Sequence, residues 1–234
     1  MQYPPDIRII RVMCTGRVDP AWIADAFVNG ADGVMVIGCH FGDCHYISGN
    51  YTARDKLDMT GEILAFARVN PKRLQFRNLS AAEGARFAQY STEFVEEIRE
   101  MGPLGSGGDG LAMPELREKL KIVRRCLAGP KLRWVIGKKP VFIQEGNKYG
   151  EVFTEHEINR TISGMILDEM ATHSILAALE KKPAAVKEIA KELEIPAPDA
   201  VKYVLALKRR GLVEMDQIAG QSPIYKCKAQ EGGC

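Results

Sequence analysis

Two strand-length apolar runs near the start of the chain each end in a cysteine, and this feature most limits the folds open to the first hundred residues. Residues 7–14 (Ile-Arg-Ile-Ile-Arg-Val-Met-Cys) end at Cys14, and residues 34–39 (Val-Met-Val-Ile-Gly-Cys) end at Cys39. A third run, 74–79, alternates in character, as is typical of a strand near an edge. Helix patterns separate the runs. This alternation predicts a parallel sheet covered by helices, because right-handed crossovers return each helix onto the sheet.

The helix patterns between and after these runs have recognisable ends. Residues 19–30 begin with Asp-Pro and end with Asn-Gly, a second amphipathic stretch follows residue 50, and Ser80 with Glu83 forms a capping box for a third helix that reaches Met101. The fold class is therefore predicted as α/β. The N-terminal domain is expected to be a three-layer, flavodoxin-like arrangement of a parallel sheet and helices.

The rest of the chain is set apart by a Gly-rich stretch, residues 102–110, which is expected to be a flexible break. A basic helix is predicted over residues 113–128. The segment 131–170 combines two short apolar runs, a Gly-Asn turn and a helix from Thr154. The predicted organisation is an α/β domain over 1–103, a linker and basic helix region over 104–170, a winged-helix-like domain over 171–228 and a tail over 229–234.

Three short helices and two strands are predicted toward the C terminus. The helices cover residues 174–179, 186–193 and 198–210, and the strands lie between Leu212 and Cys227. This order resembles a winged helix-turn-helix module.

Composition and charge exclude several classes of protein. Apolar residues make up 46% and charged residues 26% of the 234 residues, as in an ordinary folded protein, and no apolar run approaches the roughly 20 residues that span a bilayer. The start of the chain lacks the basic and apolar regions of a secretory signal peptide, so we expect a cytoplasmic protein whose cysteines stay reduced. The net charge of +2 does not point to a polyanionic partner.

The basic residues gather in one segment, residues 117–139, where they face a single acid, Glu118. Such a segment is either a solvated helix face or a docking surface for an acidic partner. Its basic residues are Arg117, Lys119, Lys121, Arg124, Arg125, Lys131, Arg133, Lys138 and Lys139.

Three thiols are expected to meet at one edge of the sheet, because the carboxyl ends of parallel strands share an edge and Cys44 follows Cys39 by five residues. Thiolates favour zinc, cuprous copper or iron–sulfur clusters. Cys14, Cys39 and Cys44 with His40 or His45 would complete a tetrahedral zinc site, whereas an iron–sulfur cluster needs a fourth donor, usually a thiolate. The spacing leaves zinc and iron–sulfur both open, beside the simpler interpretation of inert thiols. The other cysteines are predicted to be structural or free: Cys126, Cys227 and Cys234.

The residues around these cysteines resemble a known family. Residues 8–20 (RIIRVMCTGRVDP) and 30–51 (GADGVMVIGCHFGDCHYISGNY) are similar to the small iron–sulfur delta subunit of methyl-viologen-reducing hydrogenases. The similarity continues through residues 80–84 (SAAEG) to 101–103 (MGP), and so covers nearly the first half of the chain.

The resemblance implies an electron-transfer subunit without an active site of its own. It implies a 2Fe–2S cluster rather than zinc, with Cys14, Cys39 and Cys44 as ligands, and electron transfer between a hydrogenase or formate dehydrogenase and a heterodisulfide-reductase-like flavoprotein. Gly38 and Gly42 are expected to let backbone amides approach the cluster. A flavin bound to this chain is not expected, because no Gly-rich phosphate loop follows a strand.

Two features depart from this family. Its members begin with a further strand ending in a cysteine pair, upstream of a Tyr-Pro-Pro such as residues 3–5, and that strand does not precede this motif here. The fourth ligand is therefore expected from elsewhere, or the chain begins late, at an internal Met that follows a selenocysteine codon. The gene sequence upstream of Met1 tests this hypothesis.

The winged-helix-like extension is the second departure, and it raises an alternative function as an iron–sulfur redox-sensing regulator that binds DNA. Residues 198–203, which begin the helix that would enter the major groove, offer one lysine and one acid, whereas base readout uses Arg, Asn, Gln or Ser. From residue 171 onward ten basic residues face eight acidic ones, a small excess for phosphate binding. We therefore expect the extension to dock proteins and not nucleic acid.

Overall fold

The computed structural model describes residues 2–106 and 108–228, so the tail over 229–234 and Cys234 lie outside the described residues. The chain divides into two compact units, residues 1–163 and 164–234, and each unit is described by itself. Among the described residues, no helix has both the length and the apolar character that crossing a membrane requires.

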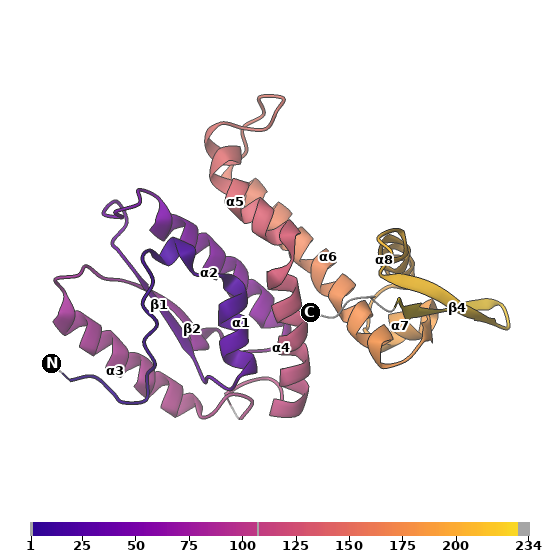
Figure 1. The fold of residues 1–234 in the computed structure, drawn as a ribbon, viewed down its shortest axis with the longest axis horizontal. Coiled ribbons are helices and arrows are strands. Elements are labelled where there is room, and N and C mark those ends of the chain that lie inside the picture. The colour runs from indigo at the N-terminus through magenta and orange to yellow at the C-terminus, as the bar shows by residue number, and fades with distance from the viewer. Residues whose placement is uncertain (1, 107, 229–234) are drawn as a thin grey trace. The chain divides into compact units, whose positions relative to one another are not determined.

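The first unit contains a small parallel sheet and most of the helices. In chain order its elements are η1 (Thr15–Arg17), α1 (Pro20–Val28), β1 (Val34–Gly38), α2 (Gly49–Phe66), η2 (Pro71–Arg73), β2 (Leu74–Asn78), α3 (Gly84–Met101), α4 (Met113–Ala128), α5 (Pro130–Gln144) and the start of α6 (Glu155–Lys181) (Figure 1). β1 and β2 pair in parallel, from Val34 opposite Leu74 to Gly38 opposite Asn78. The prediction of a mixed α/β fold with parallel strands is confirmed.

The predicted first strand is wrong. Residues 7–12 belong to no strand, and none of the backbone hydrogen bonds found among the described residues involves them. Ile10 is 84% exposed, so this run also lacks the burial that its apolar character suggested. The preceding residues are held toward α3, where Arg99 bonds to Asp6 at 2.8 Å, and a strand forms only where a neighbouring edge accepts its backbone groups.

The core of the first unit follows from helical spacing. In α4, Leu116, Leu120, Val123 and Leu127 recur every three or four residues and are fully buried. They form the face with which α4 packs against α1, where Phe27 is fully buried as well. The basic residues of α4 therefore lie on its other sides.

The segment after α4 is more regular than its sequence suggested. Both short apolar runs fall within one helix, α5, which contains Pro140. Leu132, Val135, Ile136 and Lys139 are buried and follow the i, i+3, i+4, i+7 spacing of one helix face. One continuous helix therefore forms where two separate apolar runs were predicted, because burial of this face outweighs the interruption by proline, and the helix predicted from Thr154 is present as α6.

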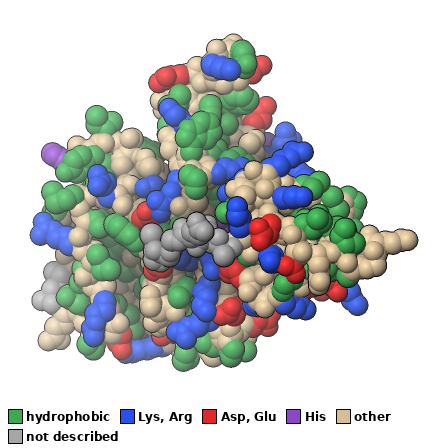
Figure 2. All heavy atoms as spheres, turned by 45° about the vertical axis from the view of Figure 1, so that its right-hand side comes forward, with side chains coloured by type: hydrophobic (Ala, Val, Ile, Leu, Met, Phe, Trp, Pro, Cys, Tyr) green, Lys and Arg blue, Asp and Glu red, His purple; other side chains and the backbone are tan. Residues whose placement is uncertain are grey.

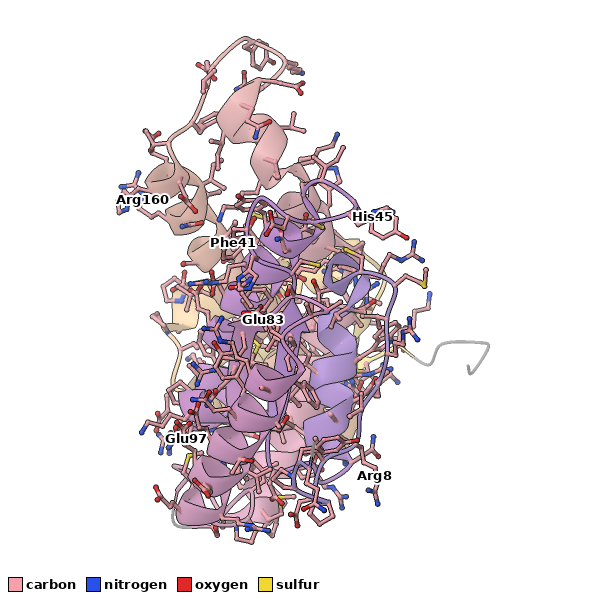
Figure 3. All side chains as sticks on the ribbon, turned by 90° about the vertical axis from the view of Figure 1, so that its left-hand side faces the viewer. Arg8, Phe41, His45, Glu83, Glu97 and Arg160 are labelled. Atoms are coloured by element: carbon pink, nitrogen blue, oxygen red, sulfur yellow. The ribbon has the colours of Figure 1, made fainter. Side chains whose placement is uncertain are left out.

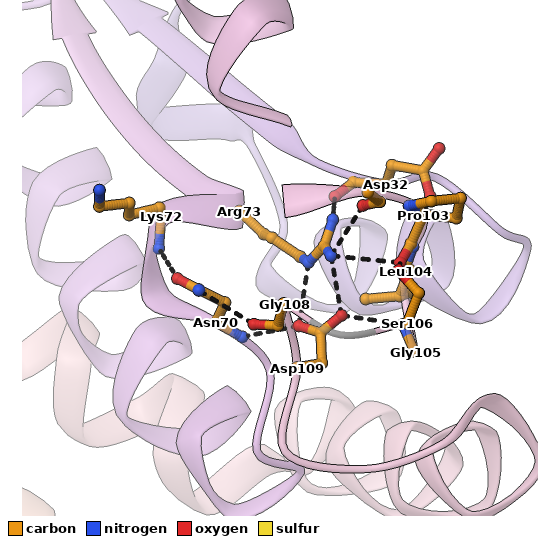
Figure 4. A network of polar contacts seen from close by, with 11 residues as sticks. Asp32, Asn70, Lys72, Arg73, Pro103, Leu104, Gly105, Ser106, Gly108 and Asp109 are labelled. Carbon is orange, nitrogen blue, oxygen red and sulfur yellow. Dashed lines mark hydrogen bonds and ion pairs between the residues drawn. The ribbon is translucent and has the colours of Figure 1, made fainter. Parts of the chain in front are cut away.

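The loop over residues 102–110 is anchored and is not the open break that its glycines suggested (Figure 4). The Arg73 guanidinium and the Asp109 carboxylate form an ion pair at 2.8 Å, and both side chains are fully buried. Arg73 also donates to the carbonyl oxygens of Asp32, Gly102 and Pro103. Both ends of the loop are thus tied to Arg73 of η2, immediately before β2.

The second unit contains the rest of α6 and a three-stranded sheet. Its further elements are β3 (Ala184–Ala185), α7 (Val186–Glu192), α8 (Ala197–Arg209), β4 (Val213–Ala219) and β5 (Ser222–Cys227). The strands are antiparallel in the order β3-β5-β4. The core combines α6, α7 and α8 through Ile175, Ile189 and Leu207. The two predicted helices over 186–193 and 198–210 and the following strand pair are present.

Candidate thiol site

Two of the three predicted thiols lie side by side in the first unit. The Sγ atoms of Cys14 and Cys44 are 4.0 Å apart, although 30 residues separate them in the chain. Cys14 immediately precedes η1, and Cys44 lies in the loop between β1 and α2. In Figure 3 the labelled loop residues Phe41 and His45 lie above Glu83, whereas Glu97 and Arg8 lie below it.

A glycine at the start of α2 makes room for the thiol pair. A Cβ atom on Gly49 would lie 2.2 Å from Cys14 Sγ and 3.3 Å from Cys44 Sγ. Gly16 is equally confined, since its Cβ would lie 2.9 Å from Gly49 Cα. Only glycine therefore lets η1 and the first turn of α2 approach closely enough to form this site.

Backbone amides favour charge on one of the two thiols. Burial acts to raise the pKa of Cys44, but hydrogen bonds from the amides of Asn50, Tyr46 and Gly49 outweigh it and leave that pKa lowered. These amides belong to the first turn of α2 and the loop before it, where unpaired N–H groups attract negative charge. Burial raises the pKa of Cys14, and proximity to Cys44 adds to this, against a hydrogen bond at Gly16. The surroundings thus favour the charged form of Cys44 and disfavour that of Cys14.

The third predicted thiol lies outside this pair. Cys39 is exposed, whereas Cys44 is buried and Cys14 is half-buried. Its carbonyl oxygen accepts hydrogen bonds from the side chains of Asn50 at 3.1 Å and Asn78 at 2.6 Å, which hold the backbone at the end of β1. Within residues 2–106 and 108–228, no three histidine, cysteine or acidic side chains are arranged to hold a metal ion.

The histidines have other contacts. His40 Nε2 lies 2.6 Å from a carboxylate oxygen of Glu83, so this nitrogen is already engaged. The ring of His45 contacts that of Tyr46, with 5.1 Å between centroids. His40 thus links the cysteine loop to Glu83 at the start of α3.

The Glu83 carboxylate should make this link sensitive to acid. A hydrogen bond from the Ser80 amide, then one to His40, lower the pKa of Glu83 to about 2. A carboxyl group whose pKa is lowered by folding stabilises the folded state at pH values above its pKa in the unfolded chain. That stabilisation is lost as the pH falls through its pKa in the folded state. We expect amide exchange in residues 80–88, corrected for intrinsic rates, to accelerate as the pH falls toward 2. Glu83→Gln should show the faster exchange already at neutral pH; equal protection in both proteins would contradict this role.

The geometry of the pair fits a soft metal centre. Two thiolates bound to one tetrahedral ion at about 2.3 Å lie about 3.8 Å from each other, close to the separation seen here. Gly49 and Gly16 have no side chain that would separate the two thiols. Sulfur donors favour zinc or iron–sulfur centres over hard cations. Cys14 and Cys44 could therefore supply two of the four donors that such a centre requires.

Sequence reasoning missed the residues that build this site around the thiols. Gly49 and Gly16, whose amides bond to Cys44 and Cys14, were not among the glycines predicted to lie at this site. A Cβ on Gly38 would meet Phe76 and Thr15, while Gly42 has a φ of +93° and open space beside it. The Ser-Gly-Asn sequence of residues 48–50 was the available indication of this site, because glycine and asparagine at the start of a helix bring backbone and side-chain N–H groups together.

The basic segment of residues 117–139 is largely paired within its own unit. The face of the molecule drawn in Figure 2 shows both acidic and basic side chains. The ion pairs of the segment itself favour the interpretation of a solvated helix face over that of a docking surface. The pairs are Lys119 with Glu115, Lys121 with Glu118, Arg124 with Asp25, Arg133 with Asp19, and Lys139 with Asp55 and Glu155.

The first unit is thus an α/β unit with a pair of thiols beside the start of a helix. Similarity to known proteins identifies its family. The family model described as methyl-viologen-reducing hydrogenase, delta subunit, matches residues 1–102. The chain is 46% identical over 101 residues to the iron-sulfur subunit of the F420-non-reducing hydrogenase from Archaeoglobus profundus, which covers 43% of this chain and 74% of that protein. The chain therefore belongs to the delta-subunit family of methyl-viologen-reducing hydrogenases.

A second group of relatives is much longer. The chain is 47% identical over 106 residues to one subunit of the ferredoxin:CoB-CoM heterodisulfide reductase from Methanosarcina mazei. This match covers 45% of this chain and only 13% of that protein. The similarity thus concerns one module, which occurs in hydrogenase subunits and in a heterodisulfide reductase subunit.

Proposed function

We propose that the chain binds a 2Fe–2S cluster at the thiol site and transfers electrons between two partner proteins. The observation that carries this proposal is the Cys14–Cys44 pair at 4.0 Å, confined by Gly49, within a family whose relatives are named iron-sulfur subunits. When bound, the cluster would accept and return one electron at a time. Cys14 and Cys44 would hold it, with Cys39 joining from the adjacent loop and a fourth donor from outside the described residues.

The amides at the start of α2 would have a defined part in this function. Those of Tyr46, Gly49 and Asn50 point their partial positive charge at Cys44. Hydrogen bonds to ligand sulfurs stabilise added negative charge and so raise the potential of an iron–sulfur centre. The exposed side of Cys39 would leave one edge of the site open to a partner.

The names of the relatives suggest the partners. We propose a heterodisulfide-reductase-like subunit on one side and a hydrogenase subunit, or a formate dehydrogenase in its place, on the other. Support comes from the occurrence of the same module in an iron-sulfur hydrogenase subunit and in a heterodisulfide reductase subunit. Anaerobic purification with the natural partners, followed by electron paramagnetic resonance and metal analysis, tests this assembly.

Cysteine substitutions test the ligand set. Cys14→Ser, Cys39→Ser and Cys44→Ser are each expected to abolish the visible absorbance of the cluster and its paramagnetic signal after anaerobic reconstitution, because each removes a thiolate ligand. Cys227→Ser, in the second unit, is the matched control and should keep the full iron and sulfide content. An unchanged spectrum for Cys14→Ser or Cys44→Ser would rule out the site, and an unchanged spectrum for Cys39→Ser would remove that residue from the ligand set.

We also propose that the first unit is a reduced flavodoxin-like scaffold and that the second unit is a winged-helix-like module that docks proteins. Two apolar side chains of α8, Val201 and Leu205, are 43% and 41% exposed and lie four residues apart on one helix face. Lys202 lies 3.9 Å from Asp168, so its charge is already balanced. An apolar, charge-balanced helix face suits a protein surface better than phosphates.

The alternative as a DNA-binding regulator makes a different prediction. Electrophoretic mobility shift with genomic fragments is expected to show only weak, unselective binding that disappears at physiological salt, because the ten basic residues from residue 171 onward face eight acidic ones and so leave little net positive charge for phosphates. Sequence-selective binding that weakens steeply with salt would favour the regulator instead. Val201→Asp, which places an acid on the exposed face of α8, should then abolish it.

A further inference from the structure

A lysine of α2 supports the turn that carries Cys14. Lys56 is half-buried, and its Nζ donates to the carbonyl oxygens of Gly16 at 2.7 Å and Val18 at 3.2 Å. These carbonyls belong to η1 and the residue that ends it, immediately after Cys14. The ammonium therefore fastens the Cys14 turn to the same helix whose first turn confines the thiols.

The surroundings of Lys56 show that this contact is its main one. Among the described residues, Lys56 forms no ion pair. Asp19 acts on it from a greater distance, and that carboxylate is bound by Arg133 at 2.8 Å. Burial and the charges of Arg133 and Arg17 leave the pKa of Lys56 lowered, although the charge of Asp19 acts to raise it. Through Gly16 and Val18 the ammonium lies against the turn that Cys14 begins.

We infer that Lys56 is a positioning residue of the thiol site, which holds Cys14 beside Cys44 through the carbonyls of Gly16 and Val18. A lysine can bridge two carbonyl oxygens because its ammonium has three donors and no acceptor. Without it, both carbonyls lose a donor in a half-buried place, and η1 can move away from Gly49. The role as a support for the thiol pair stands on this geometry alone, and its effect on the cluster rests on the proposed function.

The first test uses protein without metal, so it does not depend on the cluster. In a Cys39→Ser background, diamide oxidises Cys14 and Cys44 to a disulfide: the two thiols give up two electrons and two protons, and diamide becomes the hydrazine. Mass spectrometry of the linked peptides measures the rate. Lys56→Met should slow the reaction roughly tenfold, the effect of losing a hydrogen bond from a charged group, and Lys56→Arg should restore part of it.

A matched control comes from the same helix. Arg54 is exposed and pairs with Asp58 one turn later, so Arg54→Met also removes one positive charge from α2. It should cross-link at the wild-type rate. An unchanged rate in Lys56→Met, with native circular dichroism in all variants, would overturn the positioning role.

The second test concerns the loaded protein. Adding an electron adds a negative charge, which a nearby ammonium favours. Lys56→Met is therefore expected to shift the midpoint potential, followed by paramagnetic resonance, to more negative values, whereas Lys56→Arg and Arg54→Met should stay near wild type. If Lys56→Met cross-links slowly and wild type takes up no cluster, the positioning role holds and the proposed function fails. If wild type is loaded but Lys56→Met has unchanged cross-linking, the positioning role fails alone.

Discussion

Replacing Asp109 by alanine is expected to lower the free energy of unfolding of the first unit by about 3–5 kcal/mol, the range found when one partner of a buried ion pair is removed. The Arg73 guanidinium would remain fully buried without its carboxylate. The amides of Asn70 and Gly105, which donate to Asp109 at 2.9 and 2.8 Å, would also lose their acceptor. The substitution therefore removes the centre of the network in Figure 4, and with it the anchor of the loop over residues 102–110.

Tryptophan fluorescence during urea unfolding measures this effect, because both tryptophans, Trp22 and Trp134, lie in the first unit. Arg99→Ala is the control: it breaks an ion pair with Asp6 that is largely exposed, and should cost at most about 1 kcal/mol. A loss for Asp109→Ala as small as that of the control would show that the buried pair is not needed for stability.

The pH dependence of the same pair has a definite sign. Burial acts to raise the pKa of Asp109, but hydrogen bonds from Arg73 and from backbone amides outweigh it, so the pKa is lowered. The stabilisation by the ionised Asp109 carboxylate is complete above the ordinary carboxyl pKa of about 3.9. It is lost as the pH falls through the pKa of Asp109 in the folded protein. The difference in stability between wild type and Asp109→Ala should therefore shrink under acid conditions and stay constant near neutrality.

Local patterns predicted most of the helices, because caps and apolar spacing act within a few residues of the chain. The Asp19 side chain accepts a hydrogen bond from the Ala21 amide and begins α1 as expected, and α4 spans the predicted residues 113–128. Strand formation depends on a partner edge elsewhere in the fold, so the apolar run over residues 7–12 could not be assigned from its own sequence. The buried face of α5 was visible in the spacing, but Pro140 and Gly137 obscured it.

The candidate site, like the fold, could be predicted from the sequence only in part. Cysteines at the ends of strand-like runs pointed to the region of the candidate site, and Cys14 and Cys44 do lie together. The exposed position of Cys39 could not be derived, since it depends on how the loop after β1 returns to α2. Gly49 and Lys56 contribute to the site because they contact the turn after Cys14, more than 30 residues earlier in the chain. Composition and motif spacing do not predict such a contact.

Gly49→Ala is expected to empty the thiol site while leaving the fold intact. The added Cβ would lie 2.2 Å from Cys14 Sγ, so the thiol must rotate away from Cys44. Alanine is also the better helix former, so α2 should not be weakened. Substitutions next to metal ligands typically reduce metal affinity by about 10–100-fold, and we expect a loss of this size in iron and sulfide content after anaerobic reconstitution.

Gly61→Ala is the matched control on the same helix, because a Cβ at that position meets nothing within 4 Å. It should stabilise α2 by about 1 kcal/mol, the usual gain of alanine over glycine inside a helix, and should keep full cluster content. Cross-linking of Cys14 to Cys44 by diamide separates the two variants without any metal: it should fail in Gly49→Ala and proceed normally in Gly61→Ala. If Gly49→Ala cross-links and loads like wild type, the close approach of η1 to α2 does not shape the site. If Gly49→Ala unfolds instead, the glycine is required for folding and not specifically for the thiol site.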